Sequence, residues 1–291
     1  MADQTVVGVD VGGSHITAAR VDLKVGTLQP ETLTRAHVQA NGTKEEIIKA
    51  WTKHIQAAAG DKAKENTRIG IAMPGPFDYE KGISLMKFQD KYDALYGLHV
   101  KELLADELKL QPGQFRFMND AACFLQGEAF GGAAKGAKQA IGVTLGTGLG
   151  SAIYKDGLAA DAALWCVAYK DGIAEDYLSG RWLVKRYHSL SGVEVPHVKA
   201  LIELLPEYPL VQEVFDEFGE ELGRFLAPYI HQENSEMLVI GGNIAQSLEL
   251  ILPQLRQTLA EHAIAIPIKR AQLGEEAALI GAASLWEERP Q

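Results

Sequence analysis

Cysteine is scarce in this sequence, and long apolar runs are absent from it. Only 2 of its 291 residues are cysteines, Cys123 and Cys166, and they stand too far apart for a CxxC motif or a disulfide framework. No uncharged apolar run approaches the roughly 20 residues that span a bilayer, and no basic segment precedes an apolar stretch near the start. The sequence therefore predicts a cytoplasmic protein without a membrane partner.

Positive charge is also sparse. The 28 Lys and Arg residues are outnumbered by 38 Asp and Glu residues, which gives a formal net charge of -10 and no dense basic stripe that could follow a phosphate backbone. We therefore expect no nucleic-acid partner. Hydrophobic residues make up 47% of the chain, and its length is sufficient for two lobes of roughly 100–150 residues each.

Two strand modules, both punctuated by glycines, follow one another along the chain. The first contains a predicted hairpin, Thr5–Val11 with His15–Val21, then a helix over Thr43–Ala59 and a strand over Arg68–Ala72. The second contains strands over Gln114–Met118, Ala140–Leu145, Leu149–Tyr154 and Met237–Ile240, with helices over Tyr208–His231, Ile244–His262 and Glu275–Trp286. This repetition predicts an α/β protein with two related lobes.

The first hairpin turn combines a carboxylate with two glycines and a serine. Asp10 is near the end of a buried strand, and Gly12, Gly13 and Ser14 follow it. Backbone N–H groups in such a turn can approach phosphate oxygens, Ser14 can add a hydroxyl donor, and Asp10 could orient Mg²⁺ through its water shell. The alternative is an ordinary hairpin turn with a surface aspartate.

A second glycine-rich turn, Gly146-Thr147-Gly148, joins two predicted strands. A strand rather than a helix follows it, so it is not a Rossmann fingerprint, and it lacks the GK[ST] of a Walker loop. A hairpin turn lined with N–H groups and Thr147 still suits phosphate. Two such turns are less easily explained by coincidence than one.

Asn119 and Asp120 stand where a predicted strand meets a predicted helix. Asp120 there has two compatible roles, as an N-cap and as a general base held still by rigid elements. A third strand ends in Gly241-Gly242-Asn243, where bare backbone could lie against adenine or ribose. The alternative for that motif is an ordinary strand-to-helix turn.

In this order, the four motifs resemble the ATPase fold shared by hexokinases and actin, and specifically the ROK family of bacterial sugar kinases and sugar-responsive repressors. The resemblance covers almost the whole chain and includes the segment Gly70–Pro76, which is similar to the family's loop beside the sugar. It implies a two-lobed actin-like fold with ribonuclease H-like lobes and an interlobe active-site cleft. We expect a small lobe over residues 1–118, with a C-terminal helix over 274–291 packed back on it, and a large lobe over 119–273.

The resemblance also implies roles for individual residues. Asp120 matches the general base, and Asn119, Glu175 and Gly75 match the sugar side. The implied cofactors are ATP and Mg²⁺, with Asp10 holding Mg²⁺ through water. The residues expected to bind the nucleotide are Asp10, Gly12, Gly13, Ser14, Gly146, Thr147, Gly148, Gly241, Gly242 and Asn243.

The segment Ala163–Tyr177 departs from the family pattern. Many members carry a zinc-binding cysteine cluster here, preceded by a Glu and a His that touch the sugar, whereas this chain has Ala163 and Cys166 at those two positions. No zinc is therefore expected. The zinc-free spacing is similar to that of polyphosphate-using glucokinases, which leaves the phosphoryl donor open.

The resemblance implies an enzyme that phosphorylates a glucose-like hexose or an amino sugar with ATP, at the 6-hydroxyl. Polyphosphate as donor is one alternative, and a catalytically weak sugar or nucleotide sensor is another. An ATPase that moves a partner protein would need a large apolar surface, which the sequence does not reveal. We expect no DNA-binding domain, because the first strand begins at about Thr5. Dimers are common in the family, which makes a homodimer an expectation by analogy.

Overall fold

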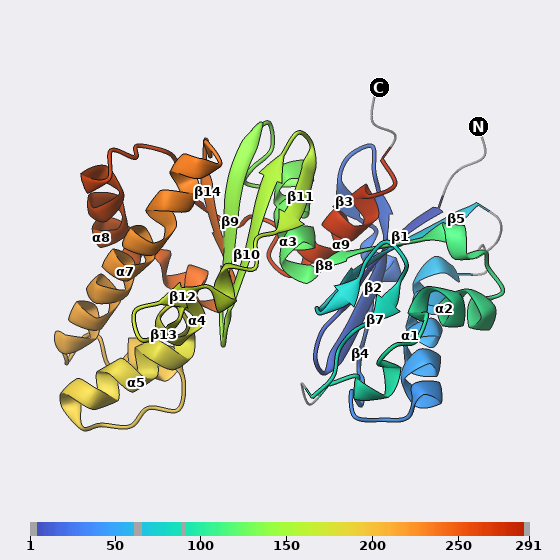
Figure 1. The fold of residues 1–291 in the computed structure, drawn as a ribbon, viewed down its shortest axis with the longest axis horizontal. Coiled ribbons are helices and arrows are strands. Elements are labelled where there is room, and N and C mark those ends of the chain that lie inside the picture. The colour runs from blue at the N-terminus through green and yellow to red at the C-terminus, as the bar shows by residue number, and fades with distance from the viewer. Residues whose placement is uncertain (1–4, 61–65, 89–90, 288–291) are drawn as a thin grey trace. The chain divides into compact units, whose positions relative to one another are not determined.

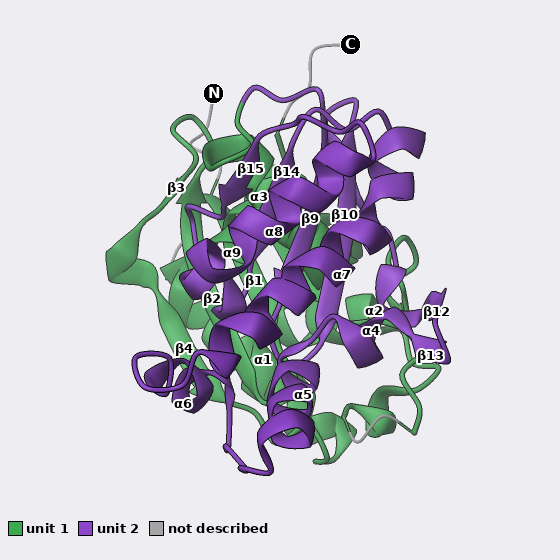
Figure 2. Ribbon diagram, turned by 90° about the vertical axis from the view of Figure 1, so that its left-hand side faces the viewer, with its two compact units in different colours: residues 1–135, 275–291 green, residues 136–274 purple. Residues whose placement is uncertain are grey.

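The computed structural model describes residues 5–60, 66–88 and 91–287, which form two compact units (Figures 1 and 2). Unit 1 comprises residues 1–135 and 275–291, and unit 2 comprises residues 136–274. The domain boundary predicted from the sequence lies after residue 118, whereas the compact units divide after residue 135. Helix α3 (Asp120–Gly131) belongs to unit 1 because it packs against helix α9 (Glu276–Ser284). Residues 1–4 and 288–291 of the predicted small lobe lie outside the described residues.

The sheet of unit 1 has the strand order β3-β2-β1-β5-β8, and β4 also pairs with β2. Its strands are β1 (Thr5–Val11), β2 (His15–Asp22), β3 (Thr27–Leu28), β4 (Thr34–His37), β5 (Thr67–Met73) and β8 (Phe115–Asn119). A two-stranded ribbon, β6 (Phe77–Asp78) with β7 (Ile83–Ser84), follows β5. Strand β1 is antiparallel to β2 and parallel to β5, which is parallel to β8.

Helix α1 (Lys44–Ala59) buries its apolar side against this sheet. Thr43 caps it: the threonine side chain accepts a hydrogen bond from the Glu46 N–H, and the Glu46 carboxylate accepts one from the Thr43 N–H at 2.8 Å. Its buried side chains Ile47, Ile48, Trp51 and Ile55 share one core with Val7, Val9 and Val11 of β1. Helix α2 (Val100–Leu108) packs beside α1 and adds Val100 and Leu104 to the same core.

Helix α9 approaches the strands of unit 1 so closely that two positions admit only glycine. Gly8 of β1 and Gly70 of β5 are partners in the parallel ladder. A Cβ at Gly8 would lie 2.1 Å from the Leu279 carbonyl oxygen, and one at Gly70 would lie 1.9 Å from that of Ala282. The missing side chains let the helix backbone rest directly on the sheet.

The sheet of unit 2 repeats this topology in the order β11-β10-β9-β14-β15. Its strands are β9 (Gln139–Leu145), β10 (Leu149–Lys155), β11 (Leu158–Asp161), β14 (Leu238–Gly241) and β15 (Ile268–Arg270). Strand β9 is antiparallel to β10 and parallel to β14, which is parallel to β15. The two sheets therefore combine antiparallel and parallel pairs in the same sequence, as the repetition of glycine-punctuated strands predicts.

The helices of unit 2 bury a second core. Its helices are α4 (Ala174–Tyr177), α5 (Gly180–Ser191), α6 (Val198–Glu203), α7 (Leu210–Gln232) and α8 (Leu248–Glu261). The apolar side of α7, including Phe215, Phe218 and Leu222, packs with Val143 of β9 and Ile240 of β14. A short hairpin, β12 (Ala168–Tyr169) with β13 (Gly172–Ile173), leads directly into α4.

Candidate functional site

The turn joining β1 to β2 carries Gly12, Gly13 and Ser14. The Gly12 N–H donates to the His15 carbonyl oxygen at 2.8 Å, and the Ser14 hydroxyl lies 2.8 Å from the His15 Nδ1. A Cβ built at Gly12 would come no closer than 3.5 Å to another atom, and one at Gly13 no closer than 3.9 Å. Packing does not demand glycine at either position, so the bare backbone here leaves room for a ligand.

Two residues that the sequence did not single out adjoin this turn. The Tyr92 hydroxyl donates to the Gly12 carbonyl oxygen at 2.6 Å, and its buried ring packs edge-on against Trp51. The Cδ atom of Lys91 lies 3.9 Å from the position of a Cβ on Gly13. Both belong to an irregular segment without hydrophobic periodicity, and only the fold places them next to the turn.

Asp10 occupies the end of β1, just before this turn. Burial, together with the negative charge of Asp120, raises the pKa of Asp10 from 3.8 to about 6, while the nearby Arg35 opposes the shift. A cation beside two interacting carboxylates would relieve this unfavourable electrostatic arrangement. The acidic pair therefore suits a hard cation such as Mg²⁺, which prefers oxygen ligands and keeps several waters.

The sequence allowed Asp120 two roles, as the helix N-cap and as a general base, and the structure gives the first of them to Asn119. Asn119 is the N-cap of α3, since its Oδ1 accepts hydrogen bonds from Ala121 N at 2.8 Å and from Ala122 N at 3.1 Å. Asp120 is the first residue of the helix and is exposed, with its Oδ1 accepting from Ala121 N at 2.9 Å. The structure thus assigns the N-cap to Asn119, and the Asp120 carboxylate is accessible to a substrate.

Tyr79 connects Asn119 with Gly75. The Asn119 Nδ2 donates to the Tyr79 hydroxyl at 3.3 Å, and that hydroxyl donates to the Met73 carbonyl oxygen at 3.2 Å. The same hydroxyl lies 3.2 Å from the position of a Cβ on Gly75. The residues expected on the sugar side in unit 1 are therefore connected by a tyrosine that sequence reasoning missed.

The parallel strands explain why distant motifs meet within unit 1. Asp10 of β1 is the register partner of Ala72 in β5, and Met73 of β5 is the partner of Asn119 in β8. All three strands therefore end at one edge of the sheet. Ligands of α/β proteins characteristically bind at the carboxyl ends of such strands.

In unit 2, the turn joining β9 to β10 carries Gly146, Thr147 and Gly148. The Gly146 N–H donates to the Gly148 carbonyl oxygen at 3.0 Å, and the Gly180 N–H donates to the Gly146 carbonyl oxygen at 2.8 Å. A Cβ at Gly146 would have no neighbour within 4 Å, and Thr147 is exposed. This turn is therefore also open to a ligand.

Glu175, expected on the sugar side, lies against the same turn. Its Oε2 accepts a hydrogen bond from Leu149 N at 3.0 Å, and its Oε1 pairs with Arg181 Nη2 at 2.5 Å. A Cβ at Gly148 would lie 2.3 Å from the Glu175 Oε2, so Gly148 is needed for this contact. The carboxylate thus braces the turn and holds an arginine.

A cavity of about 990 Å³ adjoins this turn within unit 2. Its lining includes Gly146, Thr147, Gly180, Arg181, Val184, Lys185, His188, Pro196, Lys199, Asn243 and Ser247. Three of the predicted nucleotide residues therefore line one cavity, which also carries cationic and apolar side chains of α5 that the sequence did not indicate. Such a mixture suits a ligand with both a flat apolar part and phosphates.

Gly241 and Gly242 are not among the residues that line this cavity. Gly242 has a φ of 81°, and a Cβ there would lie 2.4 Å from the Leu145 carbonyl oxygen, so this position requires glycine for folding. Gly241 ends β14, where its register partner is Thr144 of β9. The two glycines bring Asn243 to the cavity through a tight turn at the end of the strand.

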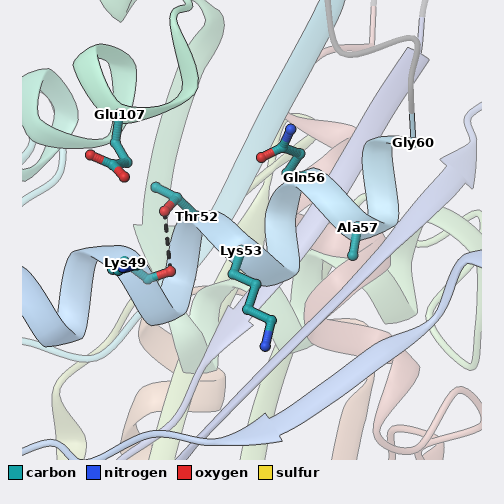
Figure 3. Close-up of a pocket in the computed structure, with 7 residues that line it drawn as sticks. All are labelled: Lys49, Thr52, Lys53, Gln56, Ala57, Gly60 and Glu107. Atoms are coloured by element: carbon teal, nitrogen blue, oxygen red, sulfur yellow. Dashed lines mark hydrogen bonds between the residues drawn. The ribbon is translucent and has the colours of Figure 1, made fainter.

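A further cavity of about 550 Å³ lies between α1 and α2 in unit 1 (Figure 3). Its lining comprises Lys49, Thr52, Lys53, Gln56, Ala57, Gly60 and Glu107. None of the residues predicted to act in catalysis or binding contributes to it. The Thr52 hydroxyl is already bonded to the Ile48 carbonyl oxygen at 2.9 Å, which leaves the exposed side chains of Lys49, Lys53, Gln56 and Glu107 as the other polar groups of the lining.

The segment that departs from the zinc-binding pattern is ordered by side-chain contacts. Cys166 is exposed, and its Sγ donates to the Ala163 carbonyl oxygen at 3.2 Å. Among the described residues, no group of three or more His, Cys, Asp or Glu side chains is placed to bind a metal ion. Within the same residues, no helix combines the length and apolar character needed to cross a bilayer.

Comparisons with known proteins place this arrangement in a family. The ROK family model matches residues 6–161 and 157–289. The chain is 28% identical to a glucokinase of Thermotoga maritima, with 98% of each chain covered, and 26% identical to an N-acetyl-D-glucosamine kinase of Photobacterium profundum, with 96% and 98% covered. Among solved structures, a ROK family glucokinase from Streptomyces griseus in complex with glucose and AMPPNP matches with a TM-score of 0.73 and 24% identity, over 97% of this chain and 98% of that one.

The fold is that of the actin-like ATPases, with an α/β unit repeated in one chain, as the sequence predicts. The chain belongs to the ROK family, so the resemblance based on the glycine turns and the Asn119-Asp120 pair is confirmed. The roles of the individual site residues stay predictions, for which the geometry above gives the physical basis.

Proposed function

We propose that this protein is an ATP-dependent sugar kinase that transfers a phosphoryl group to a hydroxyl of a hexose or amino sugar, with the 6-hydroxyl of a glucose-like sugar as the acceptor. The proposal rests chiefly on Asp120, an exposed carboxylate at the sheet edge where Asp10 and the Gly12-Gly13 turn also lie. Relatives that cover 98% and 96% of the chain are a glucokinase and an N-acetyl-D-glucosamine kinase, which supports this acceptor class.

Asp120 acts in this proposal as the general base. It accepts the proton of the attacking sugar hydroxyl as the oxygen forms its bond to the terminal phosphorus and the bond from that phosphorus to the ADP leaving oxygen breaks. Asn119 and Glu175 orient the sugar through hydrogen bonds, and Gly75 leaves space beside it. Because Asn119 caps the helix through its Oδ1, an Nδ2 hydrogen is the group it offers to a sugar hydroxyl.

Each of the two glycine turns offers groups that bind phosphate: N–H groups and the Ser14 hydroxyl in unit 1, and N–H groups and the Thr147 hydroxyl in unit 2. The nucleotide, with its phosphates, occupies the cavity lined by Thr147, Arg181 and Asn243. Asp10 would hold Mg²⁺ through its waters, and the bound ion would neutralise phosphate charge. The raised pKa of Asp10 and the interaction of Asp10 with Asp120 fit this role of Asp10. We place this activity in the cytoplasm and expect no zinc.

The test is an ADP-release assay over glucose, N-acetylglucosamine, N-acetylmannosamine, fructose and allose, with ATP and polyphosphate as alternative donors. Asp120→Asn should reduce the turnover number by about 10²- to 10⁴-fold. The same change should leave the melting temperature nearly unaltered, because Asn119 supplies the cap. The matched control is Asp106→Asn, which alters an exposed aspartate on α2.

Two outcomes would overturn the proposal. One is ADP release that does not depend on any sugar, which would indicate an ATPase. The other is sugar binding without turnover by the native protein, which would favour a sensor. Turnover with polyphosphate but not ATP would keep the acceptor chemistry and replace the donor.

A further inference from the structure

The carboxylate of Glu175 is held by two groups of unit 2. Its Oε2 accepts the Leu149 N–H at 3.0 Å, next to the Gly146–Gly148 turn, and its Oε1 lies 2.5 Å from the Arg181 Nη2. Glu175 is in α4 and Arg181 is in the first turn of α5, six residues later. One residue predicted to contact the sugar is therefore tied to an arginine on another helix.

Arg181 also lines the cavity assigned to the nucleotide, together with Thr147 and Lys185. A guanidinium binds phosphate through two parallel N–H donors, as it binds a carboxylate. A phosphate in this cavity and the Glu175 carboxylate would therefore compete for the same arginine. The competition is physically easy because the pair is accessible: the Arg181 side chain is 62% exposed and that of Glu175 is 24% exposed.

An exposed ion pair contributes only about 0–1 kcal/mol to stability, so a multiply charged phosphate can displace the carboxylate at little cost. After its Oε1 loses Arg181, the Glu175 side chain stays where it is. Its Oε2 still accepts the hydrogen bond from the Leu149 N–H and still lies against Gly148. Its Oε1 then becomes available to accept a hydrogen bond from a sugar hydroxyl.

We propose that the Glu175–Arg181 pair couples the binding of the two substrates: donor phosphate draws Arg181 away from Glu175, which prepares Glu175 to bind the sugar. This inference rests on the proposed function, because it assigns the two substrates to those residues. The coupling is positive and reciprocal, so bound sugar also favours nucleotide binding by the same factor. Arg181 is a positioning residue here, since it acts on the sugar through Glu175.

The test measures the dissociation constant of the accepted sugar, glucose or N-acetylglucosamine, by calorimetry with and without saturating Mg²⁺–AMPPNP. In the native protein we expect AMPPNP to tighten sugar binding about fivefold or more. In Arg181→Gln the sugar should bind at least as tightly without nucleotide, because Glu175 is already released. The tightening by AMPPNP should then fall below about twofold.

Arg186→Gln is the matched control, because Arg186 lies on the same helix and pairs with Glu217 at 2.7 Å but does not line the cavity. It should keep the native coupling factor. A native coupling factor near one, or a factor unchanged in Arg181→Gln, would overturn the inference. Sugar-dependent ADP release by the native protein tests the proposed function separately, so the two failures can be told apart. The Arg181→Gln variant should have the melting temperature of the native protein, because Arg181 is exposed.

Discussion

The Tyr92 hydroxyl donates a 2.6 Å hydrogen bond to the main-chain carbonyl oxygen of Gly12, which links an irregular segment to the first glycine turn. Tyr92→Phe removes this bond and keeps the ring packing against Trp51. We expect a loss of about 1 kcal/mol in the free energy of unfolding and a rise of several-fold in the KM for ATP, with the KM for the sugar little changed. Chemical denaturation and steady-state kinetics would measure both, and Tyr96→Phe, an exposed tyrosine of the same region, is the control. Equal increases in both KM values would contradict a role specific to the turn.

Asp10 should make the stability of the metal-free protein depend on pH. Burial and the charge of Asp120 raise the pKa of Asp10 to about 6, so the folded protein holds this proton more tightly than the unfolded chain does. Its contribution to the free energy of unfolding is therefore greatest at acidic pH and is lost as the pH rises from about 4 through about 6.

Comparison of the native protein with Asp10→Asn isolates this effect. Between about pH 4 and about pH 7, the native protein should lose on the order of 2 kcal/mol of stability relative to the variant. Urea unfolding at several pH values in the absence of divalent cations would measure it. If the difference in unfolding free energy between the native protein and Asp10→Asn did not change with pH, or if the native protein gained stability relative to the variant as the pH rose, the pKa of Asp10 would not be raised in the folded state.

Gly146 and Gly242 differ in whether the fold leaves space for a side chain at their positions. A Cβ at Gly146 meets no atom within 4 Å, whereas one at Gly242 would lie 2.4 Å from the Leu145 carbonyl oxygen at a φ of 81°. We expect Gly146→Ala to change stability by less than about 0.5 kcal/mol but to weaken AMPPNP binding about tenfold or more, because the methyl group occupies the space of a phosphate. Gly242→Ala should cost more than about 2 kcal/mol of stability. Normal nucleotide affinity in a folded Gly146→Ala variant would remove that turn from the phosphate site.

Glu221 anchors the hairpin that precedes Glu175. It is buried in α7, accepts the Tyr169 hydroxyl at 2.7 Å, and pairs with Lys170 at 2.8 Å and Arg224 at 2.9 Å. Burial alone would raise the pKa of Glu221, but the hydrogen bonds from Lys170 and Tyr169 outweigh it and lower the pKa. The stabilisation is thus present above the unfolded pKa and is lost as the pH falls through the lower folded value.

Glu221→Gln should therefore destabilise the protein by about 1–3 kcal/mol near neutral pH, because two cations lose their carboxylate while solvent partly screens them. Denaturation at neutral and acidic pH would show the difference shrinking in acid. Glu220→Gln, which affects a more exposed carboxylate paired with Arg224, is the control and should change stability by less than about 0.5 kcal/mol. Equal losses in the two variants would contradict the anchoring role.

The sequence predicted the strongly patterned elements well. The first hairpin, helix α1, the strands that end in glycine motifs and helix α7 lie within a few residues of their expected bounds. Long periodic runs can be recognised in a sequence because one side of the helix or strand must be buried, which gives its apolar residues a regular spacing. The predicted helix over Ile244–His262 is divided, since a 3-10 turn over Asn243–Ser247 precedes α8. Helices α4 to α6 were not predicted, because they are short or carry many charges.

What the sequence by itself determined was the α/β class, the two related lobes and the family, because local signals such as glycine turns and an Asn-Asp pair after a buried strand occur within a few residues. Which side chains meet was decided only by tertiary structure. Parallel pairing brings the ends of β1, β5 and β8 to one sheet edge, and the packing of irregular segments places Tyr92 on Gly12 and Tyr79 on Asn119. The Glu175–Arg181 pair likewise depends on how α4 and α5 follow each other in space, since contacts of this kind arise from chain packing and leave no periodic trace in the sequence.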